Sequence, residues 1–147
     1  MQTKSNKKRH SIKKREKDYE TFIIENIDLI SESCRWGDIV KIERQYVIPI
    51  DNGRIIADIM IWHKDGTGTC IEVKTGENNR NDYLTGISQL LFYGLITEHS
   101  LKNMPRLVLA SPKIKNIAWD VVKKFNLPVN FLEVTENKCI YLSNGTK

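Results

Sequence analysis

The sequence has few cysteines and no long apolar run. Its three cysteines, Cys34, Cys70 and Cys139, lie far apart and form no C-x-x-C pair. This spacing indicates neither a zinc site nor a disulfide framework, so we expect small core residues in a reducing compartment. No apolar run approaches the roughly 20 residues that span a bilayer, and no secretory signal follows the basic start. We therefore expect an intracellular, cytoplasmic protein that does not bind a membrane.

Histidines are also scarce, and none is placed as a metal ligand. His10 lies near the N-terminus, His63 enters a predicted turn, and His99 ends a predicted helix. Because no His or Cys stands at a ligand spacing from another, we interpret all three histidines as surface residues. The sequence also has no internal repeat and no domain linker. Its 147 residues, 40% hydrophobic and 28% charged, are typical of one soluble globular domain.

Positive charge is concentrated at the N-terminus. The first 17 residues carry eight Lys or Arg against Glu16 alone, a net charge of +7, whereas the whole chain carries +5. Such a segment has too few apolar residues to offset its ordering entropy, so we expect residues 1–15 to be a disordered tail when free. It would bind DNA with strong salt dependence; the alternative is a solvated leader that only aids solubility. The expected DNA contacts are Lys7, Lys8, Arg9, Lys13, Lys14 and Arg15.

The rest of the chain alternates between helical and strand patterns. Apolar residues at three- and four-residue steps predict helices at about 16–34, 81–99 and 113–125. The second helix has a predicted buried stripe that includes Leu95, and Ser111 is the predicted N-cap of the third. Apolar and alternating runs predict strands at 42–50, 54–62, 69–74, 106–110 and 129–134, with an additional edge strand at 138–142. The order αβββαβαβ is typical of an α/β fold, a mixed sheet flanked by helices.

Three chemically reactive side chains fall on one face of the predicted sheet. Glu72 and Lys74 share a face of their strand because side chains alternate. A hairpin that turns near Asp65 places Asp58 opposite Glu72 on that face. Two ionised carboxylates at such a distance repel each other, so we expect a divalent cation such as Mg²⁺ beside them, and Lys74 to position or help deprotonate the attacking water. The alternative is a structural ion pair in which Lys74 neutralises one acid.

The first predicted helix carries a further candidate acid. On a wheel of 100° per residue, Glu20 lies inside the apolar arc between Ile24 and Ile27, whereas Glu25 lies on the polar side. A carboxylate buried against an apolar surface is costly unless it is paired or bound, so Glu20 is a site candidate. The alternative is a flexible surface residue at the edge of the stripe.

In this order the candidate residues resemble the motif of the PD-(D/E)xK nuclease superfamily. The resemblance rests on Asp58 in the second strand, Glu72-Val73-Lys74 in the third, Glu20 in the first helix and Gln89-Leu90-Leu91-Phe92-Tyr93 in the next helix. It reaches from residue 20 to residue 93 and implies a restriction-endonuclease-like core. Within the superfamily, the sequence of these motifs is most similar to that of the catalytic domain of NucS/EndoMS-type endonucleases, which belong to the Q-x-x-x-Y subset.

The resemblance implies a metal-dependent DNA endonuclease that hydrolyses phosphodiester bonds with Mg²⁺, for which Mn²⁺ substitutes. The implied catalytic residues are Glu20, Asp58, Glu72, Lys74, Gln89 and Tyr93. The implied metal ligands are Asp58, Glu72 and the backbone carbonyl of Val73, while Glu20 would bind a second metal or orient its water. Gln89 and Tyr93 would support Lys74 or contact the DNA backbone; the alternative is a hydrogen-bonding pair on the helix surface.

The resemblance also sets the expected organisation, a basic tail at 1–15 and a nuclease-like domain at 16–147. Because one small domain has one active site, cutting both strands requires a homodimer or a higher homo-oligomer. The sequence does not resolve whether this is a structure-specific, a restriction or a homing endonuclease. Two alternative functions are a catalytically inactive nucleic-acid-binding module of the same fold, and a structural protein in which the acids and Lys74 form an ion-pair network.

Overall fold

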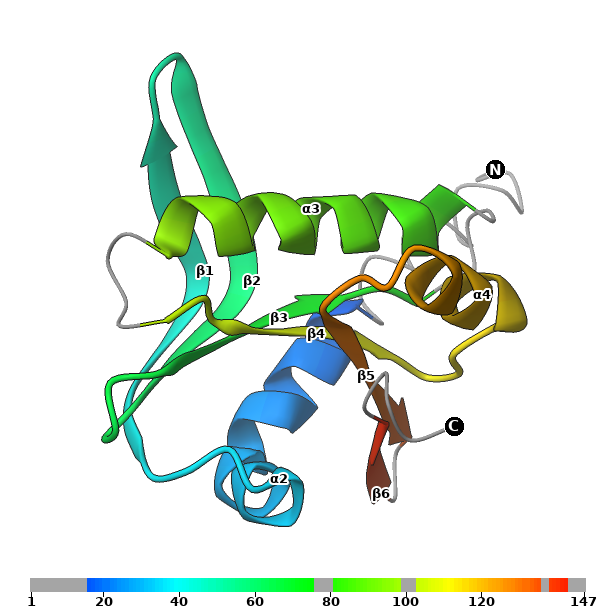
Figure 1. Cartoon of the computed structure of the whole chain (residues 1–147). Helices are drawn as coiled ribbons and strands as arrows, with labels where there is room; N and C mark the ends of the chain where they lie inside the picture. The colour runs from blue at the N-terminus through cyan, green and yellow to red at the C-terminus, as the bar shows by residue number, and fades with distance from the viewer. Residues whose placement is uncertain (1–15, 76–80, 99–102, 136–137, 143–147) are drawn as a thin grey trace, which may run out of the picture.

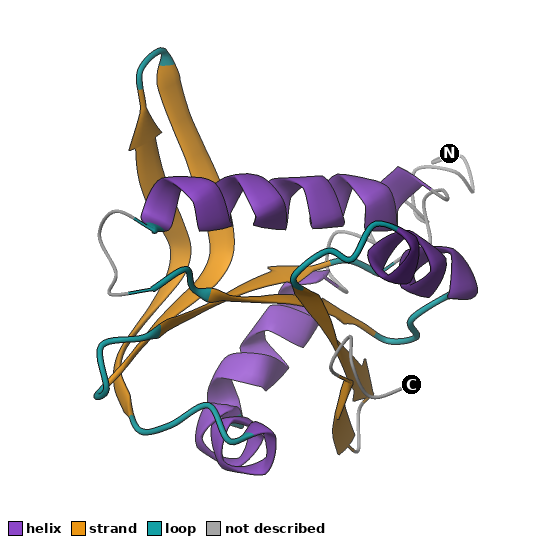
Figure 2. Cartoon of the chain, viewed as in Figure 1, coloured by secondary structure: helices purple, strands orange, loops and turns teal. Residues whose placement is uncertain are grey.

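The chain folds into a six-stranded sheet with helices on both faces (Figures 1 and 2). The computed structural model describes residues 16–75, 81–98, 103–135 and 138–142. The strands lie in the order β1-β2-β3-β4-β5-β6. Their bounds are β1 Ile39–Ile50, β2 Gly53–His63, β3 Gly68–Val73, β4 Arg106–Ser111, β5 Val129–Thr135 and β6 Lys138–Leu142. The predicted tail at 1–15, with its expected DNA contacts, lies outside the described residues.

The sheet is mixed, as predicted. Neighbouring strands are antiparallel from β1 to β3, parallel from β3 to β5, and antiparallel again between β5 and β6. The strand 138–142 therefore adds an edge to the predicted order, and the α/β fold class is confirmed. None of the helices in the described part of the chain is long and apolar enough to cross a membrane.

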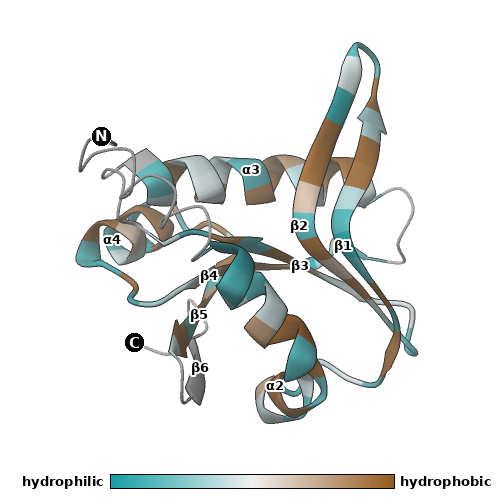
Figure 3. Cartoon of the chain, turned by 180° about the vertical axis from the view of Figure 1, so that it is seen from behind, coloured by the Kyte–Doolittle hydropathy of each residue, from teal (hydrophilic) through white to brown (hydrophobic). Residues whose placement is uncertain are grey.

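Helices cover the two faces of the sheet with separate cores. Helix α3 (Asn81–Thr97) and helix α4 (Asn116–Lys124) lie on one face, and α2 (Ile27–Cys34) lies on the other (Figure 1). The two parallel crossovers, β3-α3-β4 and β4-α4-β5, place their helices on the same face, as right-handed connections do. Tyr83, Leu90 and Trp119 fill the core under α3 and α4, whereas Ile23, Ile27 and Ile30 fill the opposite core. Figure 3 shows the apolar residues along the central strands.

The first two strands extend beyond the rest of the sheet as a hairpin arm, residues 46–57 (Figures 1 and 3). Strand β2 pairs with β3 only from Ile59 to Trp62, so its first half pairs with β1 alone. The Tyr93 hydroxyl of α3 donates a hydrogen bond of 2.8 Å to the Ile56 carbonyl and ties the arm to the helix. Asp58 is thus located at the fork where the arm leaves the sheet.

Three predicted helices differ from the structure in their bounds. The helix predicted over 16–34 is interrupted at Asn26, which leaves the helical basin and bonds the Phe22 carbonyl with its side-chain amide. The second helix ends at Thr97. The predicted helix end at His99 lies outside the described residues. The third begins at Asn116, with Lys115 instead of Ser111 as its N-cap.

Two predicted side-chain environments are wrong. Leu95 is 62% exposed, because the buried stripe of α3 continues through Leu90 to Tyr93 instead. His63 is 4% exposed, not a surface residue, and its Nε2 lies 2.7 Å from the Thr69 hydroxyl. Of the cysteines, Cys70 is buried and Cys34 half-buried, while the Cys139 side chain is outside the described part.

Candidate active site

The structure brings Asp58, Glu72 and Lys74 together at the carboxyl end of β3. The pairs Ile59↔Ile71 and Met60↔Cys70 continue to place Asp58 opposite Glu72, as the alternation predicted. Asp58 accepts a 2.8 Å hydrogen bond from the Val73 amide through Oδ2. The Lys74 ammonium lies 3.8 Å from Glu72 Oε1. A carboxylate pair and one cation therefore share a single small volume.

Glu72 is the most strongly perturbed acid of this group. It is 3% exposed, and burial together with the neighbouring charge of Asp58 raises its pKa to about 9, against the opposing effect of Lys74. Its Oε2 is buried and has no hydrogen-bond partner in the described part of the chain. A buried, unsatisfied carboxylate oxygen is costly. Glu72 therefore requires either a proton or a cation.

Glu20 faces inward, as predicted, and is 6% exposed, whereas Glu25 is exposed. Its Oε1 accepts hydrogen bonds from Arg44 Nε at 3.2 Å and from Gln45 Nε2 at 3.0 Å. Gln45 Nε2 is also 3.4 Å from Asp58 Oδ1. Burial and the charge of Asp58 raise the pKa of Glu20, and the bonds from Gln45 and Arg44 oppose this rise. Glu20 is thus linked to the acid pair through one amide.

Arg44 fastens the helical segment 16–25 to β1. Besides Glu20, its guanidinium bonds the Thr21 hydroxyl through Nη1 and the Lys17 carbonyl through Nη2, each at 3.1 Å. These bonds join one strand residue to a full helical turn. Arg44 is therefore a positioning residue for the acid-bearing helix.

Sequence reasoning missed Glu16 and Gln45 as members of this region. Burial raises the pKa of Glu16, and the charge of Lys74 lowers it. The signal for Glu16 was available, because it lies one helical turn before Glu20 and so shares its face. The signal for Gln45 is its place across the hairpin from Asp58, because cross-strand partners share a face.

The two predicted residues on α3, Gln89 and Tyr93, have different environments in the structure. Tyr93 is 2% exposed, so it is not available to the DNA backbone, and burial and then Glu72 raise the pKa of its hydroxyl. Gln89 is half-buried, and its Oε1 has no hydrogen-bond partner within the described residues. A supporting role for both residues stays a prediction.

The donor atoms fit a hard divalent cation. Asp58 and Glu72 have carboxylate oxygens, and Mg²⁺ is commonly bound by one or two carboxylates with water completing its shell. The orphaned Glu72 Oε2 is the observation of this structure that favours such a ligand. Within the described residues, no group of three or more His, Cys, Asp or Glu side chains converges as a complete metal cage.

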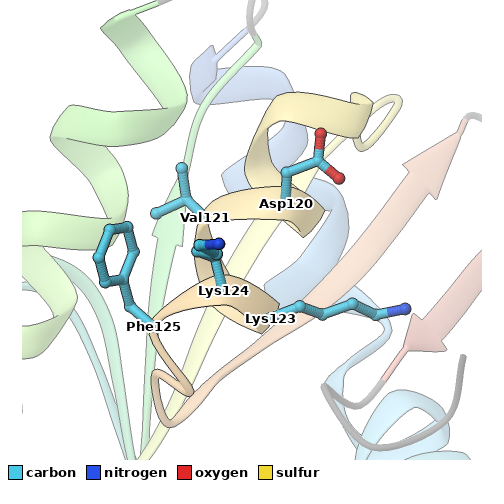
Figure 4. A pocket seen from close by; sticks show the side chains of 5 residues that line it. All are labelled: Asp120, Val121, Lys123, Lys124 and Phe125. Atoms are coloured by element: carbon cyan, nitrogen blue, oxygen red, sulfur yellow. The ribbon is translucent and has the colours of Figure 1, made fainter.

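A shallow hollow on α4 is made of other residues. It is lined by Asp120, Val121, Lys123, Lys124 and Phe125 (Figure 4). None of these residues belongs to the acid cluster formed by Glu20, Asp58 and Glu72.

The mixed sheet, the helices on both faces and the acids on β2 and β3 define a restriction-endonuclease-like α/β domain. Its fold is similar to the crystal structure of a repair endonuclease from Pyrococcus abyssi, with a TM-score of 0.50 and 24% sequence identity. The match covers 76% of this chain and 46% of that chain, so the present chain spans less than half of the length of this neighbour. No protein-family model and no curated protein matches the sequence.

Proposed function

We propose that this chain is a metal-dependent endodeoxyribonuclease that hydrolyses phosphodiester bonds of DNA. The observation that carries the proposal is the buried Glu72 carboxylate, which has one unsatisfied oxygen and lies beside Asp58 and Lys74. Strongly perturbed acids next to a specific charge partner are typical of active sites. The fold neighbour, a repair endonuclease, supports the same class of reaction.

In this proposal Asp58, Glu72 and the Val73 carbonyl hold Mg²⁺, for which Mn²⁺ substitutes. The bound cation supplies Lewis-acid polarisation of the phosphoryl oxygen and lowers the pKa of water. The Val73 amide keeps Asp58 in place by bonding its Oδ2, which leaves Oδ1 directed toward the Gln45 amide and the acid cluster. Glu20 binds a second cation or orients its water.

Lys74 orients the attacking water or helps remove its proton. Its ammonium lies within ion-pair distance of Glu72, and it also stabilises negative charge that develops on the phosphate. Gln89 and Tyr93 support this end of β3 from α3. We also propose that the substrate is DNA and that the enzyme is of the NucS/EndoMS-like subset. Cutting both strands would require a homodimer or a higher homo-oligomer.

The proposal is tested by incubating the full chain with supercoiled, branched and mismatched DNA, with Mg²⁺, with Mn²⁺ and with chelator. We expect cleavage only with the cation. Asp58→Asn should abolish it, and Lys74→Ala should lower the rate by roughly 100- to 1000-fold. Asparagine keeps an oxygen that accepts the Val73 amide bond, so Asp58→Asn should remain folded.

Asp28→Asn is the matched control, because it makes the same chemical change at an exposed residue of α2. It should cleave like the wild type. Mn²⁺ should also raise the Tm of the wild type and of Asp28→Asn but not that of Asp58→Asn. Salt-sensitive binding of DNA without turnover would indicate the inactive binding module instead, and a Tm insensitive to Mn²⁺ would indicate a structural ion-pair network.

A further inference from the structure

Gln45 has a left-handed backbone in the middle of a strand. Its φ is 54°, although it lies between Arg44 and Tyr46, which pair regularly with Ile59 and Ala57. In the described part of the chain, the other non-glycine residues with positive φ are Arg35 and Asn126. Both lie at the C-terminal ends of helices, where this conformation is usual. Only for Gln45 does the surrounding secondary structure offer no reason.

The left-handed backbone changes where the side chain points. In a regular strand, Arg44 and Gln45 would face opposite sides of the sheet. Here both side chains bond the same atom, Oε1 of Glu20. The register 44↔59 and 46↔57 also places Gln45 opposite Asp58, whose Oδ1 lies 3.4 Å from its amide. The register alone puts Gln45 on the face of Asp58, whereas the unusual φ accounts for Gln45 and Arg44 bonding one oxygen of Glu20.

We propose that Gln45 is a positioning residue that holds the carboxylate of Glu20 against that of Asp58. Its side-chain NH₂ has two hydrogens and can donate one to each acid. Because Gln45 bonds Oε1 of Glu20, and no hydrogen bond to Oε2 occurs among the described residues, Oε2 is left for a cation or its water. Strained backbone at a site is maintained when it serves the site's geometry. This inference rests on the proposed nuclease function and extends it to a residue outside the resemblance.

The Gln45 amide bridges the two acids in the absence of a cation. Glu20 is carried by the helical segment 16–25, and Asp58 by β2, so no covalent or ladder contact fixes one against the other. Arg44 anchors Glu20 to β1 but not to Asp58. Removing the Gln45 amide should therefore let the two carboxylates separate while both elements stay folded.

The test uses two variants of the full chain, Gln45→Ala and Gln45→Gly. Both should lower kcat and Mn²⁺ affinity by roughly 10- to 100-fold, the usual effect of losing a residue that orients a metal site, with KM for DNA unchanged. Only glycine relieves the positive φ, so Gln45→Gly should have a Tm at or above the wild-type value, and Gln45→Ala should not. Mn²⁺ affinity is measured by calorimetry without DNA.

The control is Val47→Gly, an exposed position of the same strand. It should show the reverse pattern, with a lower Tm and wild-type cleavage and Mn²⁺ affinity. If Gln45→Gly binds Mn²⁺ and cleaves like the wild type, while Asp58→Asn is inactive, the positioning role is overturned and the nuclease function stands. If the wild type neither cleaves DNA nor binds Mn²⁺, the nuclease proposal fails and this inference fails with it.

Discussion

At the scale of single residues, His63 ends a hydrogen-bond chain that begins at Arg106. Arg106 donates through Nη1 to the Thr69 hydroxyl at 2.9 Å, and Thr69 Oγ1 lies 2.7 Å from His63 Nε2. The Thr69 oxygen accepts from the guanidinium, and it can still donate to the histidine ring or accept from it. The charge of Arg106 near the ring disfavours a second proton on His63.

We predict that acid destabilises the protein through His63. Burial and then the charge of Arg106 lower the pKa of His63, while the Gly37 backbone and then the charge of Asp65 oppose this shift. As the pH falls below about 6.5, unfolded chains take up a proton that folded His63 resists, so the free energy of unfolding decreases. The loss continues down to the lowered folded pKa and then stops. Urea denaturation between pH 8 and pH 4 measures it.

His63→Gln isolates this contribution from the carboxylates that titrate nearby. Its side-chain amide can accept from the Thr69 hydroxyl or donate to it, so we expect a cost of about 1 kcal/mol at pH 8. The stability difference between wild type and variant should shrink as the pH falls. A difference that is constant over the whole pH range would contradict the role assigned to His63.

The acids of the site could be predicted from the sequence because their positions follow simple periodicities. Alternation placed Asp58 opposite Glu72, and the helical wheel turned Glu20 inward. Gln45 could be predicted only in part: the hairpin register places it beside Asp58, but its bond to Glu20 depends on one backbone angle that no residue pattern encodes. His63 was misplaced because its partner Thr69, and Arg106 that bonds Thr69, come from two other strands.

At the scale of elements, helix α3 closely approaches β4 and Lys74, the residue after β3, at a glycine. A Cβ added to Gly86 would lie 2.7 Å from Leu109 Cδ1 and 3.1 Å from Lys74 Cγ. Leu109 is buried in the core and has little room to move. The missing side chain of Gly86 therefore makes space for the stem of Lys74 between α3 and the sheet.

We predict that Gly86→Ala displaces Lys74 and slows cleavage. Crowding of this kind costs about 1–3 kcal/mol, whereas alanine gains about 1 kcal/mol of helix propensity, so a net destabilisation of about 1 kcal/mol is expected. Misplacing a catalytic group can lower the rate by up to about 100-fold. The measurements are the Tm and kcat on the DNA substrate that the wild type cuts.

Gly94→Ala is the matched control on the same helix. Its added Cβ would be 3.1 Å from Leu107 Cδ1 and near Met104, and none of its nearest neighbours belongs to Lys74. It should therefore alter stability without lowering kcat. Equal losses of activity in both variants would show that the helix as a whole, and not the Lys74 stem, is the sensitive part.

Most elements could be predicted because local patterns and turn residues define them. The strands and their turns followed from alternation and from Asp51-Asn52-Gly53. The start of α4 could not be predicted, because tertiary bonds hold the preceding segment outside the helix. The Tyr83 hydroxyl donates to the Lys113 carbonyl at 2.7 Å, and the Ile114 amide donates to Glu133 at 3.1 Å.

At the scale of the whole molecule, charge is divided between the tail and the domain. Residues 1–17 carry a net charge of +7, which leaves −2 for residues 18–147. The acid cluster adds local negative charge where the DNA phosphate would have to approach. Under the proposed function, attraction to DNA should therefore depend mainly on the N-terminal residues.

We predict that deleting residues 1–15 weakens DNA binding and reduces its salt dependence. These residues contain seven Lys or Arg, so the slope of log K against log salt should become less steep by up to about 6. Fluorescence anisotropy at several salt concentrations measures it. A tail of equal length with Gln at the seven basic positions is the control, and it should behave like the deletion. A slope equal to that of the wild type would exclude contact between tail and DNA.

The hairpin arm has a consequence for protein engineering. In the arm, residues 46–50 of β1 form strand pairs with residues 53–57 of β2, and β3 pairs with β2 only from Ile59 to Trp62. The exposed turn at residues 51–53 is therefore outside the ladder between β2 and β3. Exposed loop tips of this kind tolerate insertions. A peptide tag or a fluorescent label could therefore be grafted at the tip, and the fork that carries the acid would keep its own strand pairing.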